Sequence, residues 1–164
     1  MGEVSRRAKV APLLALFAIV TGCSVGAPST FTLNTASVDE SYVCPTSANN
    51  LSYTIHAIIA VHNGTSSSVA IRSVAVVMTL AAVKGGWLEH IGDKYDAAGV
   101  GVSPETVSAG SSPSLNLGIP SACTNGKLPS SGTSYGEYSV AFTVVTSSGT
   151  RTISSQNRHR IVAA

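Results

Sequence analysis

The chain has 164 residues and a formal net charge of +2, with 44% hydrophobic and 11% charged side chains. Three of its ten basic and one of its eight acidic residues precede Cys23, so the rest carries seven of each and is neutral overall. This balance leaves no basic patch that would favour nucleic acid or anionic lipid, and the length after Cys23 suits a single domain.

The first 22 residues predict an export signal. Basic residues near the start are followed by an apolar run over residues 10–20 and by the small pair Thr21-Gly22 before Cys23. This is the layout of a secretory signal peptide. The run is too short to cross a bilayer, which needs about 20 residues. An ordinary secretory signal that happens to contain a cysteine would look the same up to this point.

The sequence Val20-Thr21-Gly22-Cys23 resembles the lipobox of bacterial lipoproteins. The resemblance implies that a diacylglyceryl group alkylates the Cys23 thiol and that cleavage makes Cys23 the first residue. We therefore expect a signal peptide over residues 1–22, a lipidated cysteine and short tether over 23–30, and a folded domain over 31–164.

The same resemblance implies a location and a first partner. The lipid anchor would hold the exported chain on a membrane of the bacterial cell envelope. Ser24, not an aspartate, follows the cysteine, which in lipoproteins of diderm hosts usually implies the outer membrane. In a monoderm host the place would be the outer face of the cell membrane.

From residue 31 onward, apolar and polar residues alternate in runs separated by turns, a pattern that predicts strands. Runs at 31–38, 51–63, 69–83 and 114–120 each predict one strand, and 135–162 predicts a hairpin that turns at TSSG. Residues 84–111 are less clear, with short strands or turns expected near Trp87 and Val100. No long amphipathic helix is predicted.

About seven strands in one domain predict an all-β antiparallel sandwich. The order of the strands and the final hairpin resemble an immunoglobulin-like or fibronectin-like domain. The chain departs from antibody domains, because no cysteine lies inside the expected second or sixth strand and Trp87 lies beyond the third.

Cys44 and Cys123 are the cysteines that remain after Cys23, and an even pair in an exported chain predicts a disulfide. Two thiols could instead bind a metal with nearby histidines, although no C-x-x-C or H-x-H spacing supports this. In the expected sandwich both cysteines lie in connections at the same end, which favours a disulfide between them. This disulfide would close a loop of about 80 residues.

Other candidate residues carry weaker signals. His56 and His62 share a strand face but lie about 20 Å apart, and they are expected to be exposed. His90 lies among acidic residues, in either a loop metal site or a solvated charged loop. Asn63-Gly64-Thr65 fits the glycosylation pattern, but the lipobox points to a bacterial source and hence to no glycan.

Two function classes stay open. The first is a membrane-anchored envelope lipoprotein with a non-catalytic Ig-like module, which binds an envelope protein or glycan or has a structural role. The alternative is an envelope carrier of a small ligand or metal that uses the histidines and Met78, although Met78 falls in an inward stripe. No nucleotide or G-x-S-x-G motif occurs, and we expect neither an enzyme nor a cofactor.

A partner surface is expected on the sheet of the third, sixth and seventh strands. Its outer face should carry small, uncharged side chains: Ala75, Val77, Thr79, Ala141, Thr143 and Val145. Surfaces that need only solubility usually carry Lys and Glu, and contiguous apolar surface often marks an interaction site. The alternative is that residues 84–111 fold over this face.

Overall fold

The computed structural model describes residues 30–125 and 134–163. These residues form strands and loops without a helix, so this part of the chain contains no helix that could cross a membrane. The predicted signal peptide over 1–22, Cys23 and the tether up to residue 29 lie outside the described residues.

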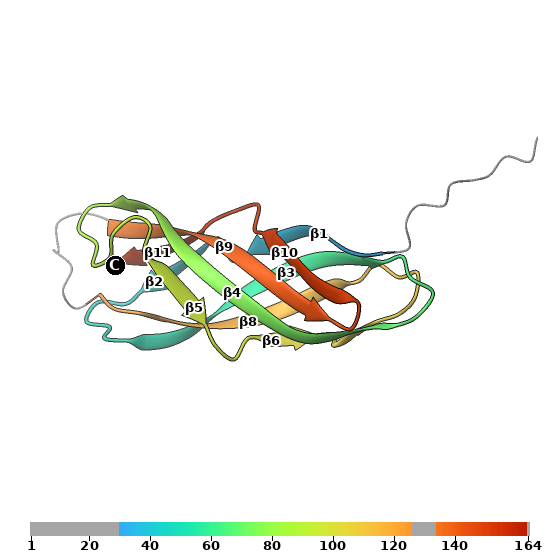
Figure 1. Cartoon of the computed structure of the whole chain (residues 1–164). Coiled ribbons are helices and arrows are strands. Elements are labelled where there is room, and N and C mark those ends of the chain that lie inside the picture. The colour runs from blue at the N-terminus through green and yellow to red at the C-terminus, as the bar shows by residue number, and fades with distance from the viewer. Residues whose placement is uncertain (1–29, 126–133, 164) are drawn as a thin grey trace, which may run out of the picture.

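The strands form two sheets that pack face to face, and Figure 1 shows β4 and β9 crossing over β3 and β8. The first sheet has the order β1 (Phe31–Val38), β3 (Leu51–Asn63), β8 (Ser114–Cys123) and β6 (Gly101–Ser103). The second has the order β2 (Ser41–Cys44), β11 (His159–Ala163), β9 (Ser134–Thr146), β4 (Val69–Lys84) and β5 (Lys94–Ala97). In addition, β10 (Gly149–Ser154) pairs with β9, and β7 (Thr106–Val107) pairs with β4.

This topology is that of an immunoglobulin-like sandwich. In such domains one sheet has the strand order A-B-E-D and the other contains G-F-C. Here β1-β3-β8-β6 matches the first sheet and β11-β9-β4 the second, with β5 added beside β4. The short β2 pairs in parallel with β11, whereas the other pairs are antiparallel. The predicted all-β, immunoglobulin-like fold is confirmed.

The core follows the alternation of the long strands. The inward residues of β3 and β4 are buried: Ile55, Ala57, Ile59 and Val61 from β3, and Val74, Val76, Met78 and Leu80 from β4. Alternate side chains of a strand point to opposite faces, so a period of two places one set of residues between the sheets. Leu51 is in phase with this inward set but is exposed, because it lies at the end of β3.

The observed strands differ from the expected ones in several places. The final segment contains two strands, β10 and β11, instead of one. Within residues 84–111, β6 lies near Val100 as expected, but Trp87 lies in a loop, and β5 and β7 were not expected. The short strand β2 was not expected either. Finally, Cys44 and Cys123 are the last residues of β2 and β8, and so end strands instead of lying in connections.

Candidate functional site

The long strand β3 defines two poles of the sandwich. At one end of β3, Asn63 pairs with Phe31, the first residue of β1. At the other end, Leu51 pairs with Cys123. We call these ends the β1 pole and the disulfide pole. Since a strand rises about 3.3 Å per residue, the 13 residues of β3 separate the two poles by about 40 Å.

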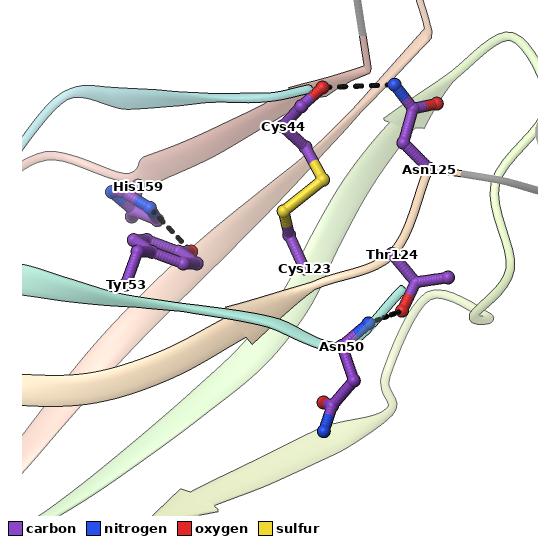
Figure 2. The surroundings of a disulfide bond; sticks show 7 residues. All are labelled: Cys44, Asn50, Tyr53, Cys123, Thr124, Asn125 and His159. Atoms are coloured by element: carbon purple, nitrogen blue, oxygen red, sulfur yellow. Dashed lines mark hydrogen bonds between the residues drawn. A yellow bond between two sulfur atoms is a disulfide. The ribbon is translucent and has the colours of Figure 1, made fainter. Parts of the chain in front are cut away.

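The disulfide pole is held together by the Cys44–Cys123 bond, which links β2 of one sheet to β8 of the other with 6.0 Å between the Cα atoms. Figure 2 shows two hydrogen bonds beside it. Asn125 Nδ2 donates to the carbonyl of Cys44 at 3.0 Å, and the Asn50 amide donates to Thr124 Oγ1 at 3.0 Å. Both cysteines are buried. The pairing agrees with the expected disulfide.

A hollow of about 270 Å³ opens beside this disulfide. The loop between β4 and β5 forms one wall, and the other lining residues come from β5, β8, β9 and β11 and from the turns before β3 and after β8. The lining residues that matter for its chemistry are Trp87, Leu88, Glu89, Tyr95, Thr124 and Tyr138. A concave site with apolar and aromatic walls and a few polar groups is the usual form of a ligand site.

Three side chains of the hollow form a hydrogen-bonded chain. Trp87 Nε1 donates to the Tyr138 hydroxyl at 3.3 Å, and this hydroxyl donates to Glu89 Oε2 in a short hydrogen bond. Burial, and then the bond to Glu89, raise the pKa of Tyr138 well above its ordinary value of 10.0, so the hydroxyl stays a donor. The chain therefore fixes the Glu89 carboxylate beside the indole ring.

Trp87 reaches this position because residue 136 is a glycine. A Cβ atom on Gly136 would lie 2.5 Å from the indole, so any side chain there would push the ring away. The loop that carries Trp87 begins at Gly85, whose φ of 70° lies in the left-handed region that glycine adopts without strain. The sequence around Trp87 gives no sign of these contacts, because Gly136 and Tyr138 lie about 50 residues away and meet it only in the fold.

The predicted partner face is brought together by pairing between β4 and β9. Ala75 pairs with Thr143 and Val77 with Ala141, while Thr79 and Val145 lie beside them in the same register. All six predicted residues are exposed or half-buried. Residues 84–111 do not cover them, because β5 pairs with β4 in the plane of the sheet. The covered alternative is therefore wrong, and partner binding at this face stays a prediction.

The metal-carrier candidates do not come together. His56 is exposed and contacts Asp39, His62 contacts Ser112, and His90 lies in an exposed loop. Met78 is buried in the core, away from all three. Within residues 30–125 and 134–163, no three His, Cys, Asp or Glu side chains are grouped as metal ligands would be.

His159, by contrast, is buried and joins the two sheets. Its Nδ1 donates to the carbonyl of Asp39 at 2.7 Å, since a carbonyl can only accept, and its Nε2 accepts from the Tyr53 hydroxyl at 3.2 Å (Figure 2). The Tyr53 ring stacks on Tyr42 with 3.8 Å between centroids. Both ring nitrogens are used by the neutral form, so a second proton on Nε2 would remove the acceptor of the Tyr53 hydroxyl and force that hydroxyl to turn.

This geometry predicts a loss of stability in mild acid. Burial lowers the pKa of His159 below its ordinary value of 6.5, so the unfolded chain takes up this proton at a higher pH than the folded chain. The free energy of unfolding should be steady above pH 6.5 and fall below it by up to about 1.4 kcal/mol per pH unit, until the pH reaches the folded pKa. Urea unfolding between pH 7.5 and 5 measures this slope.

Two variants isolate the contribution of His159. His159→Gln cannot titrate and should flatten the slope between pH 6.5 and 5, although it lowers stability overall. His56→Gln, which replaces an exposed histidine, serves as the comparison for the loss of a histidine outside the core. An equal slope in the wild type and His159→Gln would contradict the assignment.

Comparisons with known proteins identify no family. No family model and no curated protein matches the sequence. Among solved structures, the PapD-like domain 7 of human CEP192 matches with 13% identity over 93% of this chain and 96% of its own, at a TM-score of 0.30. AggA, the major subunit of aggregative adherence fimbriae from Escherichia coli, matches with 9% identity over 82% and 96%, at a TM-score of 0.37. The CooA pilin subunit of enterotoxigenic Escherichia coli matches with 16% identity over 80% and 98%, at 0.29. Scores this low support no inference about function.

Proposed function

We propose that this protein is a lipid-anchored lipoprotein of the bacterial cell envelope whose Ig-like domain is a non-catalytic binding module. The observation that carries the proposal is the Val20-Thr21-Gly22-Cys23 motif, which follows a basic start and an apolar run. The hollow at the disulfide pole supports the binding role, because it combines aromatic and apolar walls with one fixed carboxylate.

The position of the hollow fits an anchored module. Thr30, the first described residue, lies at the β1 pole, where its carbonyl accepts a hydrogen bond from Gly64. Thr30 lies seven positions after Cys23, a span of at most about 25 Å, so the β1 pole would stay near the membrane. The disulfide pole, about 40 Å further along β3, would then point away from the membrane toward ligands.

The anchor is tested by expressing the full chain in a bacterial host. The wild type should partition into the detergent phase, because two or three acyl chains bind membranes far more strongly than one. Mass spectrometry of its first peptide should show acyl groups on Cys23. Cys23→Ser should be neither lipidated nor cleaved before residue 23. Ser24→Ala, which keeps the thiol, is the matched control and should behave as the wild type. Release of an unlipidated wild type into the aqueous phase would refute the anchor.

A further inference from the structure

We propose that the hollow at the disulfide pole binds a primary alkylammonium group, with the ammonium on the Glu89 carboxylate and its carbon chain against Trp87, Tyr95 and Leu88. This inference names the ligand class of the module proposed above and rests on its binding role. It does not depend on the lipid anchor.

The charge of the hollow selects a cation. Among the described residues that line the hollow, Glu89 is the only charged one, and none is a lysine or an arginine. Within the described residues, the ion pairs of the other carboxylates involve Asp39, Asp93 and Glu137, and none involves Glu89. The carboxylate would therefore repel an anion and attract a cation.

The hydrogen-bonding groups of the hollow select a donor. A carboxylate can accept about four hydrogen bonds, and the Tyr138 hydroxyl supplies one. The indole N–H of Trp87 is occupied by Tyr138, and the Tyr95 hydroxyl donates to the Pro120 carbonyl at 3.3 Å. The strongest hydrogen-bonding capacity left unused is thus that of the Glu89 carboxylate, which can accept further bonds. An ammonium group supplies three donors.

The apolar walls and the size of the hollow favour a cation that carries a short apolar chain. Leu88 and Tyr95 are large hydrophobic residues, yet they are 50% and 43% exposed. A volume of about 270 Å³ lies near the lower end of the range for ligand pockets, which suits a short chain of four or five carbons with its ammonium. The aromatic rings add a favourable contact, since ring faces attract ammonium groups.

The chain's single tryptophan makes the proposal measurable. Trp87 lies in the wall of the hollow, so its fluorescence reports on this site alone. We would titrate the full chain at pH 7 with n-butylammonium and with N-acetyl-lysine-N-methylamide, which carries the same group on a peptide unit. Cellobiose serves as the neutral sugar probe, and calorimetry provides a second readout.

The expected result is a saturable response to n-butylammonium at millimolar concentration and none to cellobiose. An equal response to the lysine derivative would place the group on a partner protein, whereas a response to butylammonium alone would indicate a free amine. Glu89→Gln keeps an acceptor for Tyr138 but removes the charge, and it should weaken binding at least about tenfold, as expected for loss of a charge-assisted hydrogen bond.

Glu105→Gln is the matched control. Glu105 is exposed near the β1 pole, where its carbonyl accepts from Ile71, so this variant makes the same charge change far from the hollow and should bind as the wild type. Both variants should melt as the wild type does. No response to either amine by fluorescence and calorimetry, equal affinity in Glu89→Gln, or a saturable response to cellobiose alone would overturn the proposal. Failure of the anchor would appear in detergent partitioning and not in these titrations.

Discussion

Replacing Cys44 and Cys123 together with alanine should lower the free energy of unfolding by about 4.5 kcal/mol. The disulfide joins residues 79 positions apart, and in the chain-entropy model a cross-link over such a loop restricts the unfolded chain by about this amount. The loss is comparable with the whole stability of many small domains. The melting temperature should fall by roughly 10–20 °C, which calorimetry or circular dichroism measures.

Reduction of the wild type separates the cross-link from the packing of the sulfur atoms. Both cysteines are buried, so alanine also removes contacts that the reduced thiols keep. Reduced wild type should therefore lose most of the stability that the double variant loses, and the remaining difference measures packing. Before reduction, neither thiol should react with iodoacetamide under native conditions. Alkylation of both thiols in the unreduced native protein would contradict the bond.

The long strands could be predicted because their sequence pattern and their structural role coincide. β3, β4 and β9 each bury one face, so alternation in the sequence reports directly on their position in the sandwich. The same pattern placed Met78 inward and His56 outward, as the structure has them. Once the strand order was inferred, the shared pole of Cys44 and Cys123 followed, because alternate connections of an antiparallel sandwich lie at the same end.

The short edge strands could not be predicted, because they bury few side chains. β2 and β5 have four residues each, and β5 leaves Lys94, Tyr95 and Asp96 exposed. Such strands are held mainly by backbone hydrogen bonds to a neighbour, and backbone groups are the same in every residue. This is why residues 84–111 were unclear in sequence and why β2 was missed.

The hollow could not be predicted for a different reason. Glu89 and Tyr138 lie 49 residues apart, and each is an ordinary residue of its own segment. Their hydrogen bond exists only because the loop after β4 folds onto the end of β9, where Gly136 leaves room for Trp87. A partner surface such as the β4–β9 face follows from one sheet pairing, whereas this site needs a tertiary contact that no local pattern indicates.

Asn63 is the residue whose role the sequence most misrepresents. Its glycosylation-type pattern suggests an exposed side chain, yet Asn63 is 0% exposed. Its Nδ2 contacts three carbonyl oxygens, those of Ser67 at 2.9 Å, Val107 at 3.0 Å and Ser108 at 3.1 Å. Its Oδ1 accepts from Thr65 N and Thr65 Oγ1, at 3.1 and 2.7 Å. One amide thus joins the turn after β3 to the loop after β7 at the β1 pole.

Asn63→Ala should therefore lower the free energy of unfolding by about 2 kcal/mol, because the Val107 carbonyl loses a buried donor and the Thr65 amide loses its acceptor, whereas the carbonyls of Ser67 and Ser108 keep donors from Thr65 and Ser111. Urea unfolding followed by fluorescence of Trp87, at the opposite pole, measures the global change. Asn116→Ala is the control, since Asn116 is exposed on β8 and should change stability by less than about 0.5 kcal/mol.

Asn63→Asp decides which half of the amide matters. Aspartate keeps the acceptor for Thr65 but replaces the donor with an oxygen that faces the carbonyls of Val107 and Ser108. If the amide only shapes the local turn through Thr65, Asn63→Asp should be nearly as stable as the wild type. The contacts indicate instead that the amide joins the two loops. In that case the buried carboxylate of Asn63→Asp faces carbonyl oxygens with no donor between them, and this variant should lose at least as much stability as Asn63→Ala. Wild-type stability in Asn63→Asp would refute the cross-loop role.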